Sequence, residues 1–143
     1  MSAVSRFEIT LRISGDHLDP REITTLLGVE PHLAYRKGGV WKTPKGTSVV
    51  GRTGLWNVGA KEVDSGNFEE AIARFLSGIP AAPDVFLALA SRFKVELFCG
   101  LFLDEYNSGL EISPAVMTLM VERGISLDLD IYSSCDSGED CED

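Results

Sequence analysis

Apolar and polar residues alternate near both ends of the chain, and this alternation predicts a β-strand at each end. Positions 7–13 read Phe-Glu-Ile-Thr-Leu-Arg-Ile, and positions 127–132 read Leu-Asp-Leu-Asp-Ile-Tyr. A period of two is typical of a strand with one buried face. Positions 95–103 are apolar on nearly both faces, which predicts a central strand.

Helical spacing of apolar residues predicts four helices between these strands. Two of them start with a short polar residue and a proline, Asp19-Pro20 and Ser113-Pro114, and end near a glycine, as capped helices do. The other two follow Asn67 and Pro83, and their short connection predicts a helical hairpin. Glycines and prolines break positions 30–63, which predicts a ribbon of short strands, with 55–61 the best defined.

The two ends of the domain resemble copies of one strand–helix–strand unit. Each copy has a strand, a polar residue followed by proline, a helix, a glycine and a β-branched residue. A βαβ unit repeated in this way is the pattern of a ferredoxin-like sheet. We therefore expect an α+β fold: a ferredoxin-like duplicated split βαβ sheet with an inserted β-ribbon and helical hairpin.

Several short stretches of the chain are similar to the bacterial family described as domain of unknown function 4279. The resemblance covers roughly residues 5–133 and is carried by Leu-Asp-Pro at 18–20, Gly-Leu-Trp at 54–56 and Asp-Ile-Tyr at 130–132, among other stretches. It implies a small bacterial cytosolic α+β domain. It implies no activity, and no functional residues are carried over from it.

Length and cysteine content favour one domain in a reducing compartment. The 143 residues fit a single domain, which we expect over 1–133, before an acidic, disordered tail over 134–143. The start of the sequence shows no apolar leader, and no run long enough to span a membrane occurs. Three widely spaced cysteines argue against a disulfide framework. We expect a cytoplasmic protein.

Charge is unevenly distributed along the chain. The net charge is −9, from 13 basic and 22 acidic residues, which disfavours nucleic-acid and membrane binding and suits a basic partner. A simpler interpretation is that the negative charge only keeps the protein soluble.

No acidic residue lies between Pro31 and Lys61, the segment in which both tryptophans occur. Cations beside aromatic rings can bind a small anion, and the candidate ligand-binding residues are Arg36, Lys37, Trp41, Arg52 and Trp56. Alternatively, Trp56 belongs to the core and the cations pair with the protein's own acids.

Alternation also predicts which side chains lie on the sheet face opposite the helices. An RNA-binding sheet would present aromatic rings there, but the carboxylates on this face would repel phosphates and the basic–glycine–aromatic signature is missing. We expect Phe98 and Phe102 to pack under the ribbon or hairpin, or in a homodimer contact. The predicted face comprises Glu8, Thr10, Arg12, Glu96, Phe98, Phe102, Asp128, Asp130 and Tyr132.

No catalytic motif stands out in the sequence. Asp128 and Asp130 share one strand face, where paired carboxylates can bind magnesium or act in acid–base catalysis, but a solvated strand face is the commoner explanation. Nucleophile, dinucleotide and phosphate-loop motifs are missing. We expect no catalytic residue, metal or cofactor. The leading hypothesis is a non-enzymatic protein-interaction module, immunity-like in one version; the alternative is a module for a small anionic ligand bound through positions 32–61.

Overall fold

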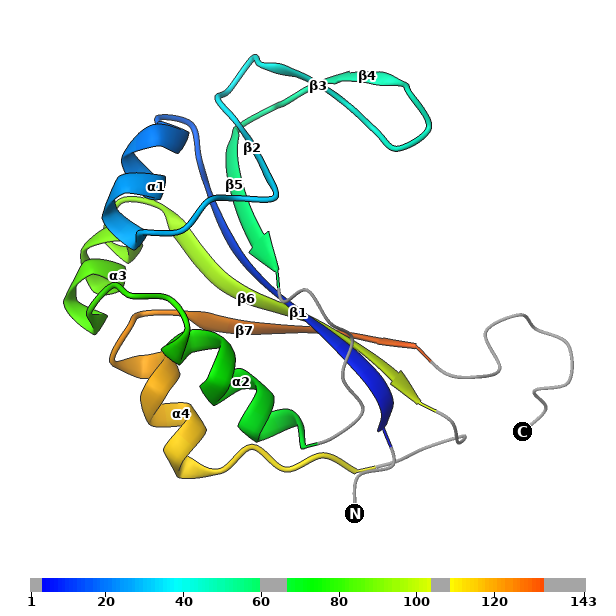
Figure 1. The fold of residues 1–143 in the computed structure, drawn as a ribbon, viewed down its shortest axis with the longest axis vertical. Coiled ribbons are helices and arrows are strands. Elements are labelled where there is room, and N and C mark those ends of the chain that lie inside the picture. Colours follow the sequence, from blue (N-terminus) through cyan, green and yellow to red (C-terminus); the bar gives the residue numbers. More distant parts are fainter. Residues whose placement is uncertain (1–3, 60–66, 104–108, 133–143) are drawn as a thin grey trace, which may run out of the picture.

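The computed structural model describes residues 4–59, 67–103 and 109–132. The predictions for the tail 134–143 and for the last two residues of the predicted strand 55–61 therefore lie outside the described residues. Figure 1 shows the arrangement of the elements. In chain order they are β1 (Val4–Gly15), α1 (Pro20–Leu27), β2 (Leu33–Tyr35), β3 (Val40–Lys42), β4 (Ser48–Val50), β5 (Gly54–Gly59), α2 (Phe68–Ser77), α3 (Pro83–Ala90), β6 (Lys94–Leu103), α4 (Pro114–Val121) and β7 (Ser126–Tyr132).

A five-stranded mixed sheet forms the centre of the fold. Its strand order is β2-β5-β1-β6-β7. β1 pairs antiparallel with both β5 and β6, β2 pairs antiparallel with β5, and β7 pairs parallel with β6. The strands predicted at the two ends of the chain therefore share one sheet, and β6 is an inner strand, as its apolar sequence indicated.

The mixed α+β content is confirmed, but the ferredoxin-like duplicated topology is not. In the first half, β5 lies between β1 and β2, so that βαβ unit is split. In the second half, β6 and β7 are direct neighbours, so that unit is not split and the two halves do not interleave. The two units differ because β5, which follows the first unit in the chain, inserts between β1 and β2. No described strand inserts between β6 and β7.

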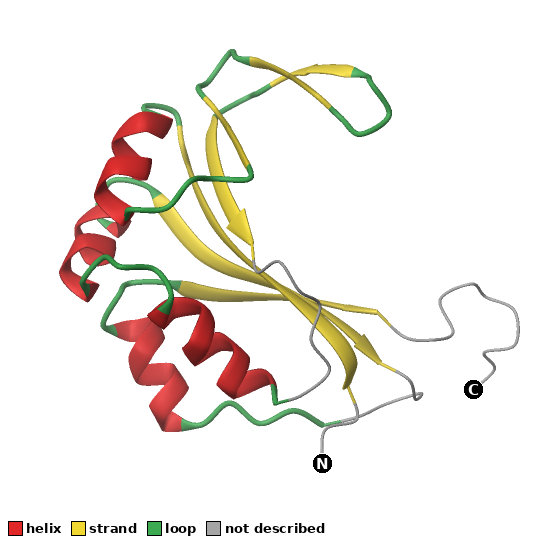
Figure 2. Cartoon of the chain, in the orientation of Figure 1, coloured by secondary structure: helices red, strands yellow, loops and turns green. Residues whose placement is uncertain are grey.

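All four helices cover one face of the sheet (Figure 2). The two crossovers leave the antiparallel pair β1–β6 in opposite directions, so two right-handed connections place α1 and α4 on the same side. The prediction that α2 and α3 pack on each other as a helical hairpin is wrong. α2 packs mainly against α4 and β1, whereas α3 packs mainly against α1 and β6. Each helix buries its own apolar stripe on the sheet, which keeps consecutive helices apart. No described helix is long and apolar enough to cross a bilayer.

Local signals start and stop these helices where the sequence predicts. The Asp19 side chain accepts a hydrogen bond from the Arg21 N–H (3.0 Å), and the Asn67 side chain accepts one from the Glu70 N–H (2.9 Å). Such bonds satisfy backbone donors that have no partner within the helix. Gly28 ends α1 with a left-handed φ of 77°, which glycine adopts without strain.

The predicted ribbon is present as β3 and β4, which pair antiparallel outside the main sheet. At the base of the ribbon, Gly51 makes two backbone hydrogen bonds to the segment that precedes β3. The Gly51 carbonyl accepts one from the Gly38 N–H (2.9 Å), and the Gly51 N–H donates one to the Gly39 carbonyl (2.8 Å). In Figure 1 the ribbon rises from the end of the sheet formed by β2 and β5. It therefore lies at the opposite end of the strand order from β7.

Candidate functional site

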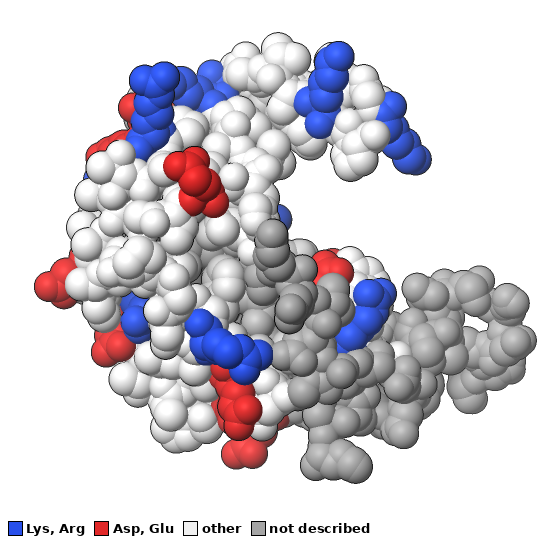
Figure 3. Space-filling view, in the orientation of Figure 1, with Lys and Arg blue, Asp and Glu red and all other residues white. Residues whose placement is uncertain are grey.

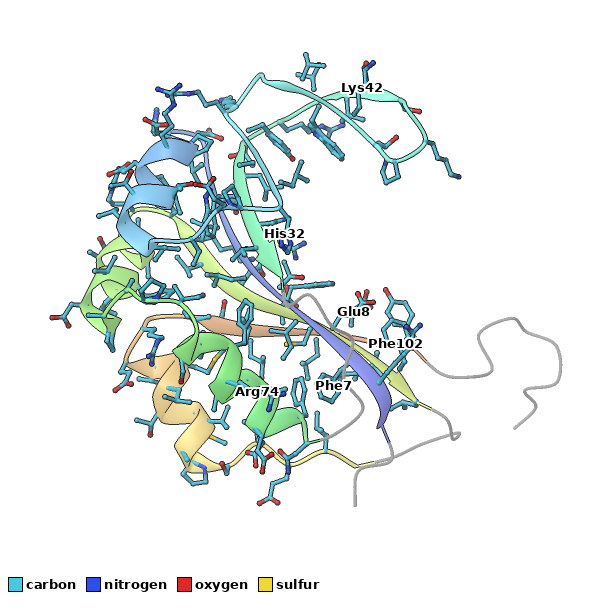
Figure 4. The ribbon with its side chains drawn as sticks, in the orientation of Figure 1. Phe7, Glu8, His32, Lys42, Arg74 and Phe102 are labelled. Carbon is cyan, nitrogen blue, oxygen red and sulfur yellow. The ribbon has the colours of Figure 1, made fainter. Side chains whose placement is uncertain are left out.

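One face of the sheet carries none of the described helices, and we call its side chains the open face. On β1 the odd positions from 7 to 13 are buried under the helices, and the even positions face the other way. In Figure 4, Glu8 and Phe102 lie on the open side, whereas Phe7 and Arg74 lie on the helix side. The predicted set is confirmed with one addition, Arg6, which the same alternation could have found. The open face contains Arg6, Glu8, Thr10, Arg12, Glu96, Phe98, Phe102, Asp128, Asp130 and Tyr132.

Three side chains form a stacked row across β1, β6 and β7. The Arg6 guanidinium lies 4.0 Å from the centre of the Phe102 ring. That ring stacks on Tyr132, with 4.9 Å between the ring centres and 12° between the planes. The strand register places the three residues directly side by side. Cation–π contacts of this kind are attractive even when exposed.

A second cluster joins an arginine to a buried carboxylate. The Arg12 guanidinium lies 4.4 Å from the centre of the Phe98 ring, and its Nε atom lies 3.0 Å from Glu96 Oε2. Glu96 is only 6% exposed, and a buried charge needs a partner of opposite sign. Arginines thus cover both phenylalanines, and the helices lie on the other face. The expected packing of these rings under the predicted hairpin is wrong.

Between these clusters the open face is anionic. Glu8 and Asp130 flank Gly100, which has no side chain to separate them, and Asp128 lies beside Phe98 in the next row. Among the described residues no cation forms an ion pair with Glu8, Asp128 or Asp130. The Tyr132 hydroxyl donates a hydrogen bond to Asp130 Oδ2 (2.6 Å), and this bond raises the pKa of Tyr132. Three carboxylates, of which Glu8 and Asp128 are exposed and Asp130 is half-buried, therefore lie together without a compensating cation from the described residues.

Two of the five ligand-binding candidates are engaged by the protein's own acids. Arg36 lies 3.0 Å from Asp19, the cap of α1, and Lys37 lies 3.3 Å from Asp16. The Thr53 hydroxyl also donates to Asp16 (2.9 Å), and the two contacts, that of Thr53 first, lower the pKa of Asp16. These pairs fasten the base of the ribbon to the start of α1.

The other three candidates lie in different environments. Trp56 is fully buried, and its Nε1 donates to the Thr24 hydroxyl (3.0 Å), so it belongs to the core. Trp41 stacks on Tyr35, with ring centres 5.7 Å apart, and its buried Nε1 has no partner among the described residues. Arg52 is exposed. The structure therefore does not gather the five into one site.

Gly51 makes the Tyr35–Trp41 stack possible. A Cβ atom at Gly51 would lie 2.3 Å and 2.5 Å from two atoms of the Tyr35 ring. We therefore expect Gly51→Ala to displace this ring from Trp41, to alter the near-UV circular dichroism and to cost about 1–3 kcal/mol of stability. Gly109→Ala is the control, since its Cβ would meet nothing within 4 Å. An unchanged near-UV spectrum in Gly51→Ala would contradict this role.

Within the part of the chain that the structure describes, no three His, Cys, Asp or Glu side chains form a group that could hold a metal ion. The arrangement that the structure does provide is a set of carboxylates beside a stacked aromatic pair on one face of the sheet. Sequence reasoning missed the arginine covers over Phe98 and Phe102. These covers depend on strand register, which local alternation does not determine.

Fold and open face together define a small α+β domain in which all the described helices cover one face of the sheet. The chain belongs to the family DUF4279, described as a domain of unknown function, whose model matches residues 5–134. Neither the curated proteins nor the solved structures include a significant match to the chain.

Proposed function

We propose that the chain is a non-enzymatic interaction module that binds a basic partner protein through its open face. The observation that supports this is a set of three carboxylates, the exposed Glu8 and Asp128 and the half-buried Asp130, which no described cation pairs with. Carboxylates that no cation of the described residues neutralises can attract lysine and arginine of a partner. Such charge complementarity speeds association and selects partners.

The surroundings of these carboxylates favour a protein partner. Tyr132 and Phe102 form a rigid aromatic platform beside the acids, and aromatic residues are common anchors in interfaces. Figure 3 shows a hollow on this side of the molecule, below the ribbon, and the ribbon carries lysine or arginine but no acid in that view. A partner that enters the hollow would meet acids on the sheet and cations on the ribbon.

An immunity-like role in the bacterial cytoplasm, in which the chain neutralises a basic toxin, is the most concrete version of this proposal. The runner-up is a small anionic ligand held by Arg52 and Trp41. Arg36 and Lys37 contribute less to that alternative because Asp19 and Asp16 already neutralise them. An open face with surplus negative charge has no part in anion binding, which is why we place the protein partner first.

The experiment is an affinity capture from native bacterial lysate with three baits. One bait is the natural chain, and the second carries Glu8→Gln, Asp128→Asn and Asp130→Asn. The third is the matched control Glu30→Gln, Asp84→Asn and Glu111→Gln, which neutralises three exposed acids outside the sheet, one on α3 and two in connecting segments. We expect a basic protein that the natural and control baits capture equally, in a salt-sensitive manner.

The expected loss for the open-face bait is at least about tenfold, which corresponds to about 1.4 kcal/mol. Equal capture by all three baits would refute the open face as the binding surface. Capture of no basic protein would refute the proposed class of partner.

A further inference from the structure

β7 forms one edge of the main sheet among the described strands. It is the last strand in the sheet order and pairs on one side with β6; no described residue pairs with its other side. It is 7 residues long, a usual length for a strand. The backbone N–H and C=O groups along such an edge are available to another strand.

The two faces of β7 differ in chemistry. Asp128 and Asp130 lie on the open face, whereas Leu129 and Ile131 lie on the helix face. These two aliphatic side chains are 39% and 58% exposed although they lie beside the core. A strand added to this edge would therefore meet carboxylates on one face and aliphatic side chains on the other.

We propose that β7 accepts an extended segment of the basic partner as a sixth strand of the main sheet, with lysine or arginine alternating with aliphatic residues. This inference rests on the proposed function and adds the mode of binding. Strand addition takes its affinity from backbone hydrogen bonds and its specificity from alternate side chains. The cations of the segment lie opposite Asp128 and Asp130, and its aliphatic residues cover Leu129 and Ile131.

Charge decides against a second copy of the chain as the added strand. In a two-fold antiparallel pairing centred on Leu129, Asp128 of each copy would lie opposite Asp130 of the other. Like charges directly opposite each other destabilise a strand pair. A basic strand removes this repulsion.

Length decides between the two edges of the sheet. The other edge strand, β2, has only 3 residues, and the chain continues from it into the ribbon. A short edge offers few hydrogen bonds, which is one way in which proteins protect an edge. Among the described strands of the main sheet, β7 is the long unprotected one.

The test measures the binding of labelled peptides to the full chain by fluorescence anisotropy. The first peptide alternates lysine and valine over seven residues. A second has the same sequence with every backbone amide methylated, which removes the donors and keeps the charge. A third has the same composition with the lysines grouped at one end, which removes the alternation.

We expect the alternating peptide to bind at least tenfold more tightly than either control and to slow hydrogen exchange of amides in β7. Ile131→Lys should abolish this binding, because it places a like charge and a polar group where an aliphatic residue is expected. Val40→Lys is the matched control: Val40 is an exposed aliphatic residue, 66% accessible, on the ribbon, and binding should persist.

The outcomes separate strand addition from the proposed function. Equal binding of the methylated peptide, or no loss in Ile131→Lys, would overturn strand addition and leave a purely electrostatic open face, which the affinity capture tests on its own. No binding of any peptide would also overturn strand addition. A dimer of the natural chain that Ile131→Lys dissociates would overturn the choice of a basic partner in favour of a second copy.

Discussion

Trp56→Ala is expected to destabilise the protein by about 3–5 kcal/mol, the usual cost of truncating a fully buried tryptophan. Trp56 is 0% exposed on β5, and its indole N–H is bonded to Thr24 on α1. The substitution therefore leaves a cavity between the sheet and α1 and removes a hydrogen bond that links them. Urea denaturation followed by far-UV circular dichroism measures the loss.

The second tryptophan is the natural control for this experiment. Trp41 lies on the ribbon, is half-buried and contacts Tyr35 of β2, so Trp41→Ala should cost clearly less. If Trp56→Ala does not fold, Trp56→Phe keeps most of the packing and should show an intermediate loss. Equal losses for the two alanine variants would contradict the placement of Trp56 in the core and Trp41 outside it.

Cys99 is expected to be almost inert towards thiol reagents in the folded protein. It lies in β6 with no exposed surface, and burial, followed by the charge of Asp128, raises its pKa to about 12. A free thiol has a pKa of about 8.5, so at about pH 7.5 the native thiolate is rarer by about three orders of magnitude. Reaction with Ellman's reagent should be slower by at least this factor.

The measurement uses a variant with Cys135→Ser and Cys141→Ser, so that only Cys99 reacts, and compares native buffer with concentrated urea. Because the pKa of Cys99 is higher in the folded than in the unfolded protein, the protonated thiol contributes to the free energy of unfolding at neutral pH. This contribution is lost as pH rises from about 8.5 towards 12. Stability should fall less steeply in this range when Cys99 is replaced by alanine. Rapid labelling in native buffer would contradict a buried thiol.

Local patterns predicted the elements of this fold well because each has a local cause. Alternation on β1 and β7 follows from one buried face, and the caps Asp19 and Asn67 satisfy backbone donors at the start of their helices. Strand neighbours have no such local cause. Whether β7 lies beside β6 or beside β1 depends on packing across the whole sheet, and the apolar pattern of β7 is compatible with either.

The same distinction holds for the open face. The sheet face on which each side chain lies follows from the alternation of side chains along a strand. Nearly all residues of the open face could therefore be predicted. The contacts within it depend on register: Arg6 covers Phe102 and Arg12 covers Phe98 only because β1 and β6 are aligned as they are. Likewise, the cationic segment is continuous in sequence, but folding brings acids from the turn before α1 to Arg36 and Lys37.

The central position of β1 has a consequence for biosynthesis. This strand leaves the ribosome before the other strands of the sheet, yet one of its two neighbours is β6, and the ion pair between Arg12 and Glu96 joins residues 84 positions apart. Until β6 has been made, an edge of β1 stays open to pairing with other nascent chains, as incompletely folded strands do. Overproduction should therefore depend on holding chaperones, and slower synthesis would prolong this vulnerable interval.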